Sequence, residues 1–320
     1  MSTTPNDHPQ RAERRIVAIV GPTGVGKSDL AIKMAKHLGG EVVNADSRQV
    51  YRHMDIGTAK PTPQQRAEVP HHLVDILNPD EEYSLAVFQK LAAKAIADIH
   101  GRSRKPILVG GTGQYVWGLL EGWQAPEVRP DAALRERLNA RLATEGVGAL
   151  HAELARLDPE AAARVDRLNP RRVIRAIEVA YDSTAASDKP RKVPPHYHAT
   201  VIGLTLDRAL LDARLDARVE AMVAAGWPDE VRRLLAMGYG QGLPSMSSMG
   251  YQELARCVAG EVTLEQAVEE TKRRTRRFAR KQNAWFRPGD PRIAWFQGTE
   301  EGHKAALEFI RNAHSGIKSL

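Results

Sequence analysis

Apolar and polar positions follow one another in the first 120 residues with the periods of alternating strands and helices. An apolar, β-branched run at 16–20 predicts a buried strand, and residues 29–38, apolar on one helical face and ended by Gly39-Gly40, predict a helix. Further strands are predicted at 41–46, 73–77 and 106–109, and an amphipathic helix at 84–100. Strands that alternate with helices form a parallel sheet with helices on both faces, so we expect an α/β domain.

The pattern changes after Trp123. Residues 131–183 are helical in pattern, with Asp131 as one helix cap and Asn169-Pro170 as the start of another helix. A Pro-, Lys- and Ser-rich loop at 184–197 follows. Beyond it, a strand is predicted at 201–206, helices at 208–225, 229–237 and from about Thr263, and a short strand at 292–296. We therefore expect a helical insertion at 121–197 within an α/β core formed by residues 14–120 and 198–300.

Composition bounds the class of protein. A chain of 320 residues with 42% hydrophobic and 27% charged residues is typical of a globular protein of one large or two medium domains. No apolar run approaches the roughly 18 residues of a membrane span, and residues 1–15 read as a polar, disordered tail rather than a signal peptide. One cysteine, Cys257, excludes an internal disulfide. We expect a cytoplasmic protein without a membrane partner.

The net charge of +7 is concentrated in two segments. Residues 272–287 contain eight Lys or Arg and no acid, and residues 164–176 form a second basic segment. This density exceeds that of an ordinary solvated helix face and predicts a polyanion partner. Candidate contacts are Arg171 and Arg172 in one segment, and Arg273, Arg276 and Arg280 on one face of the basic helix. Trp285 and Phe286 beyond it could stack on bases, but we expect at least one of them in the core.

The first strand runs into GPTGVGKS, residues 21–28, which fits the phosphate-loop pattern G-x-x-x-x-G-K-[ST]. Its glycines let successive backbone N–H groups point at phosphate oxygens, Lys27 reaches the phosphates, and Ser28 can bind Mg²⁺. Because a strand precedes the loop and a helix follows it, we interpret the match as a site for a di- or triphosphate, most often ATP or GTP in such loops. The candidate ligands are Gly21, Pro22, Thr23, Gly24, Val25, Gly26, Lys27 and Ser28.

Other candidates follow the predicted strands. Asp46 ends the strand at 41–46, where a carboxylate can hold Mg²⁺ through water, accept a proton, or merely cap a turn. Asp75 is a rival acid. The turn Gly110–Thr112 is equally compatible with an anion site and with a plain connection. Arg214 and Arg218 lie four residues apart on one helix face, so either could clamp a diphosphate, although a solvated face is the default for such a pair.

These segments together resemble the tRNA dimethylallyltransferases, also called tRNA isopentenyltransferases. The matching segments, in order, are GPTGVGKS, NADSRQVYRHMDIGTAKP (44–61), PHHLVDI (70–76), GGTGQY (110–115), NPRRVIRAIEV (169–179), MGYQE (249–253) and TRRFARKQNAWFR (275–287). DSRQVYRHMDIGTAKP is the most specific, because phosphate-loop kinases lack it. Small departures occur at Met249, Phe278, Arg280-Lys281 and Ala284, and the zinc finger of eukaryotic relatives is absent, which favours the bacterial type.

The resemblance implies a P-loop NTPase-like fold and transfer of a dimethylallyl group from dimethylallyl diphosphate to the exocyclic amine of the adenine 3′ to the tRNA anticodon. It implies that the phosphate loop, including Lys27, holds the donor diphosphate with Mg²⁺, that Asp46 is the general base, and that Arg218 contacts the diphosphate. It places tRNA contacts at Asp46, Ser47, Arg48, Gln49, Thr112 and Arg135, and puts the insertion against the anticodon stem. We expect the enzyme to be a monomer.

The sequence is also compatible with two alternatives. A small-molecule kinase of the nucleoside monophosphate type would share the loop and the sheet, but it should carry an arginine-rich lid that the sequence does not convincingly show. A non-catalytic RNA-binding protein would explain the basic helix but not a phosphate loop accompanied by Asp46. Turnover of ATP with a small acceptor, or tRNA binding without any activity to lose, would distinguish these alternatives.

Overall fold

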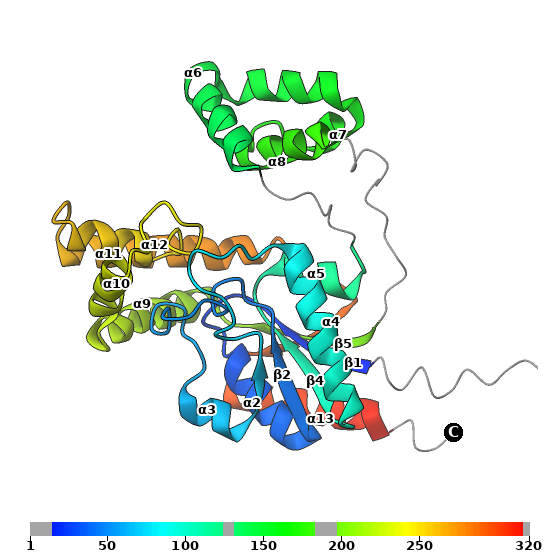
Figure 1. The fold of residues 1–320 in the computed structure, drawn as a ribbon. Coiled ribbons are helices and arrows are strands. Elements are labelled where there is room, and N and C mark those ends of the chain that lie inside the picture. Colours follow the sequence, from blue (N-terminus) through cyan, green and yellow to red (C-terminus); the bar gives the residue numbers. More distant parts are fainter. Residues whose placement is uncertain (1–14, 124–130, 183–196, 316–320) are drawn as a thin grey trace, which may run out of the picture. The chain divides into compact units, whose positions relative to one another are not determined.

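The computed structural model describes residues 15–123, 131–182 and 197–315, which belong to two compact units (Figure 1). One unit is formed by the chain up to residue 122 and from residue 194 onward, and the other by residues 123–193. The predicted tail at 1–15 and the predicted loop at 184–197 fall almost entirely outside the described residues. None of the helices within the described ranges is both long and apolar enough to cross a membrane.

The larger unit is built on a six-stranded parallel sheet in the order β3-β2-β4-β1-β5-β6. Strand β1 lies inside the sheet, where its Ala18 pairs with Leu108 of β4 on one side and with Val201 of β5 on the other. The strands are β1 (Arg15–Val20), β2 (Gly40–Asn44), β3 (His71–His72), β4 (Lys105–Val109), β5 (His198–Thr205) and β6 (Ile293–Gln297). The α/β prediction is confirmed.

Helices pack on this sheet and beside it (Figure 1). They are α2 (Lys27–Leu38), α3 (Pro63–Glu68), α4 (Leu85–Gly101), α5 (Gly113–Leu120), α9 (Arg208–Ala224), α10 (Trp227–Ala236), α11 (Tyr251–Val258), α12 (Leu264–Gln282) and α13 (Glu300–Ser315). Leu30 and Met34 of α2 share one buried cluster with Ile19 of β1 and Ile310 of α13. A second cluster gathers α10, α11 and α12 around Trp227. The first cluster also contains Val25 of the segment after β1, and the second contains Val50, Tyr51 and Met54 of the segment after β2.

The strand predicted at 73–77 is wrong. The backbone pairs with β2 only at His71 and His72, and then leaves the sheet. Leu73 and Asp75 both have positive φ angles, 64° and 58°, which an extended strand does not allow. The bend lets the Leu73 carbonyl accept a hydrogen bond from Asn44 (3.1 Å) and turns Asp75 toward basic side chains away from the strand ends.

The smaller unit contains α6 (Ala132–Leu157), α7 (Pro159–Arg164) and α8 (Pro170–Tyr181), as its helical pattern predicts. The predicted caps are present: Asp131 accepts a hydrogen bond from the Leu134 amide (3.0 Å) and Asn169 from the Arg172 amide (3.3 Å). The two helices α6 and α8 bury a small apolar core of their own, which includes Leu138, Leu150, Leu154, Val173 and Ile177.

Candidate active site

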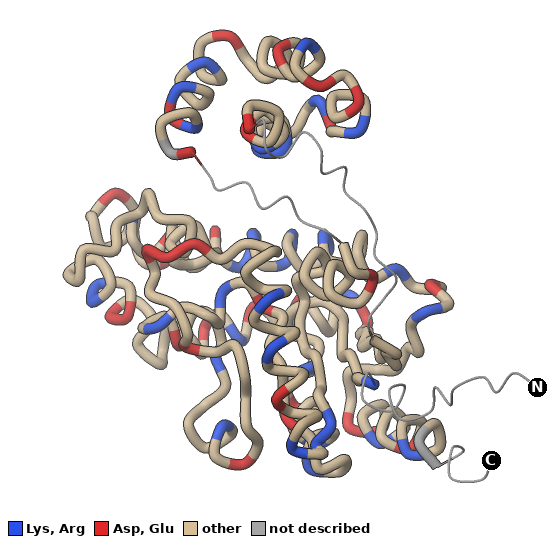
Figure 2. The backbone as a smooth tube through the Cα atoms, turned by 45° about the vertical axis from the view of Figure 1, so that its right-hand side comes forward, with Lys and Arg blue, Asp and Glu red and all other residues tan. Residues whose placement is uncertain are grey.

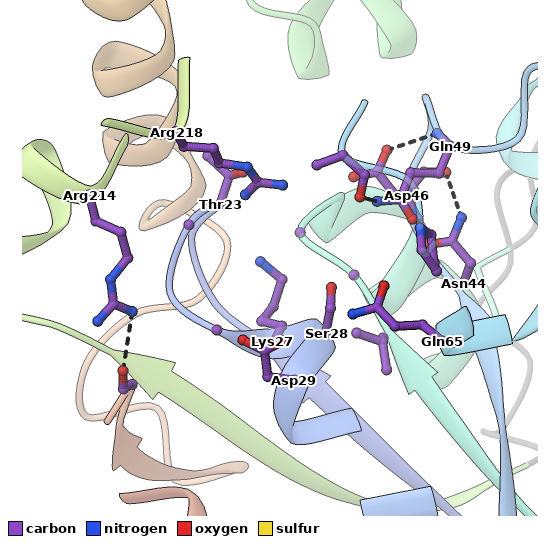
Figure 3. A pocket seen from close by; sticks show the side chains of 18 of the residues that line it. Thr23, Lys27, Ser28, Asp29, Asn44, Asp46, Gln49, Gln65, Arg214 and Arg218 are labelled. Atoms are coloured by element: carbon purple, nitrogen blue, oxygen red, sulfur yellow. Dashed lines mark hydrogen bonds between the residues drawn. The ribbon is translucent and has the colours of Figure 1, made fainter. Parts of the chain in front are cut away.

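A cavity of about 630 Å³ lies at the carboxyl ends of the parallel strands, where such sheets place their ligands (Figure 3). The phosphate loop after β1, the turn after β2 and Gly110-Gly111 after β4 all line it. Lys27, Asp46 and Arg218, which come from three separate elements, are brought together here. The cavity thus brings an ammonium, a carboxylate and a half-buried guanidinium together beside the phosphate loop.

Only part of the phosphate loop faces this cavity. Thr23, Gly24, Gly26, Lys27 and Ser28 line it, whereas Gly21, Pro22 and Val25 are buried behind it. Gly21 passes so close to β5 that a Cβ there would lie 2.4 Å from the Leu204 carbonyl oxygen. Gly26 has φ +98°, a left-handed conformation that favours glycine. The loop glycines are thus required by geometry and not only by the phosphate.

Lys27 and Arg218 provide the positive charge of the cavity. The ammonium of Lys27 donates to the Pro22 carbonyl (2.7 Å), so the side chain is held across its own loop. Burial lowers the pKa of Lys27 from 10.5 to about 8, and Arg218 adds to that effect while Asp46 opposes it. Burial also lowers the pKa of Arg218, which forms no ion pair within the described ranges. Both cations are poised to be neutralised by an anionic ligand.

Asp46 has one oxygen fixed and one free. Its Oδ1 accepts hydrogen bonds from the Arg48 amide (2.8 Å) and the Gln49 amide (3.4 Å), which makes Asp46 a turn-capping residue. Its Oδ2 accepts no hydrogen bond from any residue that the structure describes. The capping role and a chemical role are therefore compatible, because the cap orients the carboxylate and leaves an oxygen available.

Asp75 lies elsewhere. Its carboxylate pairs with Lys60 and with Arg66 (2.6 Å), and it does not line the cavity. These hydrogen bonds and charges lower the pKa of Asp75 against the opposing effect of burial. Lys60 is itself buried and also contacts the Tyr51 carbonyl (2.7 Å) and Asp55 (2.6 Å). Asp75 thus stabilises the 46–61 loop through its ion pair with Lys60. The geometry does not support Asp75 as an alternative to Asp46 for the carboxylate of the site.

Two buried polar side chains that sequence reasoning missed hold the site's loops. Gln282, at the end of α12, accepts from the Thr23 amide (2.8 Å) and donates to the Gly111 carbonyl (2.8 Å). Glu230 on α10 accepts from three successive amides, those of Asp55 (2.9 Å), Ile56 (2.8 Å) and Gly57 (3.2 Å), and from the Tyr251 hydroxyl (2.6 Å). Only the position of Gln282 inside a specific motif could have indicated its role.

Several basic side chains of helix α12 form ion pairs with acidic residues, so the helix presents less unpaired positive charge than its sequence predicts. Figure 2 shows acidic and basic residues interleaved on the helices of the larger unit. The three candidate RNA contacts on α12 all have acidic partners: Arg273 pairs with Glu270, Arg276 with Asp216, and Arg280 with Asp212 at 3.8 Å. Arg277, Lys281 and Arg287 are exposed and have no ion pair within the described part of the chain. Phe286 is buried and Trp285 is 36% exposed, so the expectation of one core aromatic is confirmed.

The other predicted tRNA contacts lie in varied surroundings. Arg48 donates to the Pro244 carbonyl (2.7 Å), and Gln49 to the carbonyls of Thr58 (3.2 Å) and Ala59 (3.1 Å). Ser47 lies between Asp46 and Arg48 in the same turn, and Thr112 precedes α5 without forming a capping hydrogen bond through its side chain. In the smaller unit, Arg135 pairs with the buried Glu178 at 2.5 Å, whereas Arg171 and Arg172 are exposed.

The fold and this loop define a protein of the P-loop class in which a carboxylate, Asp46, lines the same cavity as the phosphate loop. Two family profiles match the chain: IPP transferase over residues 49–289 and isopentenyl transferase over residues 14–71. The chain is 55% identical over 274 residues to a tRNA dimethylallyltransferase of Roseiflexus sp. strain RS-1, covering 85% of this chain and 90% of that protein. It is 49% identical over 286 residues to one of Herpetosiphon aurantiacus, covering 89% and 91%.

Solved structures agree with these relatives. A tRNA isopentenylpyrophosphate transferase of Bacillus halodurans is 41% identical, with a TM-score of 0.69 and coverage of 95% of this chain and 96% of that one. A eukaryotic dimethylallyltransferase acting on tRNA is 26% identical, with a TM-score of 0.77 and coverage of 93% and 80%. The chain belongs to the tRNA dimethylallyltransferase family.

Proposed function

We propose that this protein transfers a dimethylallyl group from dimethylallyl diphosphate to the exocyclic amine of the adenine 3′ to the tRNA anticodon. The observation that supports this best is the convergence of Lys27, Arg218 and the half-free carboxylate of Asp46 on one cavity. Family membership supports tRNA as the acceptor. The protein would act as a monomer in the cytoplasm, with the helical insertion at 121–197 on the anticodon stem.

The reaction would be a displacement at the first carbon of the donor. The adenine nitrogen forms a bond to that carbon as the carbon–oxygen bond to diphosphate breaks, and the diphosphate leaves with the electron pair. Lys27, Arg218 and the loop amides stabilise the charge that develops on the leaving group. Asp46 Oδ2 accepts the proton from the amine, while Oδ1 remains fixed by the turn. The acceptor adenine must leave its stack to reach this cavity.

Mg²⁺ fits the residues present as a partner of the diphosphate rather than of a protein cage. Within the described ranges, no group of three or more His, Cys, Asp or Glu is placed to hold a metal ion. The exposed Ser28 lines the cavity, and Mg²⁺ commonly takes one or two protein ligands together with phosphate oxygens and waters. Ser28 would hold the ion, which would neutralise charge on the leaving diphosphate.

The test is incubation of the protein with dimethylallyl diphosphate, Mg²⁺ and unmodified tRNA, followed by mass analysis of the anticodon-loop nucleosides. One adenosine heavier by a dimethylallyl group is expected. Lys27→Ala should abolish donor use while tRNA affinity stays within about threefold, because phosphate and RNA contacts lie on different residues. Phosphorylation of a small acceptor by ATP, with unchanged tRNA, would instead favour the kinase alternative.

A further inference from the structure

One buried histidine in the cavity is left without a hydrogen-bond partner. His303 lies in the first turn of α13 and is only 5% exposed, yet it lines the cavity. Neither ring nitrogen has a partner among the residues that the structure describes. Buried polar atoms in folded proteins are almost always hydrogen-bonded, since an unpaired one carries a desolvation cost. A ligand in the cavity is the natural partner for this ring.

The position of the ring relates it to the phosphate loop. A Cβ placed on Gly26 would lie 3.3 Å from Nε2 of His303, so the imidazole lies against the last turn of the loop. Gly298, Thr299 and Arg214 line the same part of the cavity, and Arg214 donates to the Gly298 carbonyl (3.3 Å). In Figure 3, Arg214 and Asp46 lie on opposite sides of Lys27. The cavity therefore has an Asp46 end and a His303–Arg214 end, and the carboxylates of Asp29 and Glu300 also line it.

The chemistry of the transfer sets the direction of the donor between these ends. The carbon that is attacked has to face the amine whose proton Asp46 accepts. The diphosphate bonded to that carbon would then lie beside Lys27, with the terminal phosphate of the donor on the side away from Asp46. We propose that His303 binds this terminal phosphate by donating a ring N–H to a phosphate oxygen, an inference that rests on the proposed function.

The charged groups around His303 predict how the contact depends on pH. Burial, Lys33 and Arg214 lower the pKa of His303, whereas Asp29 and Glu300 oppose that shift. The imidazole is therefore neutral in the free protein at pH 7 and can donate one hydrogen bond. A bound phosphate favours the protonated ring, so the contact becomes charge-assisted as the pH falls.

The experiment measures the Kd of inorganic pyrophosphate with Mg²⁺ by calorimetry at pH 6 and pH 8. The proteins are wild type, His303→Gln, His303→Leu, Lys27→Ala and the matched control His37→Gln, which changes an exposed histidine of α2. His303→Leu should bind roughly tenfold more weakly than wild type at pH 6 and only about threefold more weakly at pH 8. His303→Gln keeps a neutral N–H donor, so it should be weaker than wild type mainly at pH 6. Comparison between proteins at one pH cancels the ionisation of pyrophosphate itself. His37→Gln should match wild type at both.

Thermal midpoints without ligand separate binding from folding. Because the ring has no partner to lose, His303→Leu should unfold within about 1 °C of wild type, and only its pyrophosphate-induced stabilisation should fall. If Lys27→Ala loses pyrophosphate but both His303 variants keep wild-type affinity at both pH values, the donor site stands and the role of His303 is refuted. If wild type itself does not bind pyrophosphate, the proposed function fails and this inference with it.

Discussion

Replacing Asp46 by Asn and by Ala separates the two roles of its carboxylate. In Asp46→Asn, the amide oxygen can still accept from the Arg48 and Gln49 amides, so the turn is kept while the proton acceptor is lost. In Asp46→Ala, both are lost. A positioned base contributes about 10²–10⁴ in rate, which is roughly 3–5 kcal/mol of activation free energy. The loss of a capping hydrogen-bond acceptor costs about 1 kcal/mol of stability.

We therefore expect single-turnover transfer to be about 10²–10⁴ times slower in both variants at saturating donor and tRNA. Only Asp46→Ala should lose stability, by about 1 kcal/mol in urea unfolding. Donor affinity should stay within a few-fold in Asp46→Asn. A fall in donor affinity that extra Mg²⁺ partly restores would instead assign the carboxylate to the metal.

The outcome that refutes the base role is near-normal single-turnover transfer by Asp46→Asn. A slow Asp46→Ala beside a fast Asp46→Asn would leave Asp46 as a turn cap alone. Asp29 would then be the carboxylate to test, since it lines the cavity, whereas Asp75 is held by Lys60 and Arg66 outside it.

Three further predictions follow from the same contacts. Donor binding should need the charged form of Lys27, so donor affinity should fall about fivefold from pH 8 to pH 9. Lys27→Arg should remove that pH dependence, and an equal fall in the Arg variant would contradict the assignment. Glu230→Ala leaves buried amides unpaired, so it should lower the free energy of unfolding in urea by about 3 kcal/mol or more, whereas Tyr251→Phe should lower it by about 1 kcal/mol. Equal losses would argue against the role of Glu230 as the acceptor for these amides. Neutralising together the unpaired Arg277, Lys281 and Arg287 should reduce the salt dependence of tRNA affinity by about two to three phosphate contacts. Neutralising the ion-paired Arg273, Arg276 and Arg280 should reduce that salt dependence less, and the reverse order would mean that these ion pairs open when tRNA binds.

The sequence predicted the features whose causes are local. The phosphate loop depends on a strand, a glycine turn and a helix within 25 residues, and each is readable from residue type. The helix caps at Asp131 and Asn169 are equally local. The strand at 73–77 failed because Asp75 turns toward Lys60, a tertiary contact that overrides an apolar pattern.

Contacts between distant segments could not be predicted. Gln282 lies 259 residues from Thr23, and Glu230 lies about 175 residues from the amides that it binds. The charge of α12 was readable, but its ion pairs to Asp212 and Asp216 of α9 depend on how the two helices cross. His303 belongs to no recognisable pattern, and only its burial without a partner marks it.

The bridge made by Gln282 has a consequence for the order of events. The side chain that ends α12 fixes the Thr23 amide of the phosphate loop and the Gly111 carbonyl at once. If RNA binding moved that helix end, the phosphate loop would have to move with it or one of these hydrogen bonds would break. Thermodynamic reciprocity then requires that bound donor alter tRNA affinity by the same factor as bound tRNA alters donor affinity. In the proposed reaction, the Gln282 amide would therefore couple the binding of the two substrates before any bond between them forms.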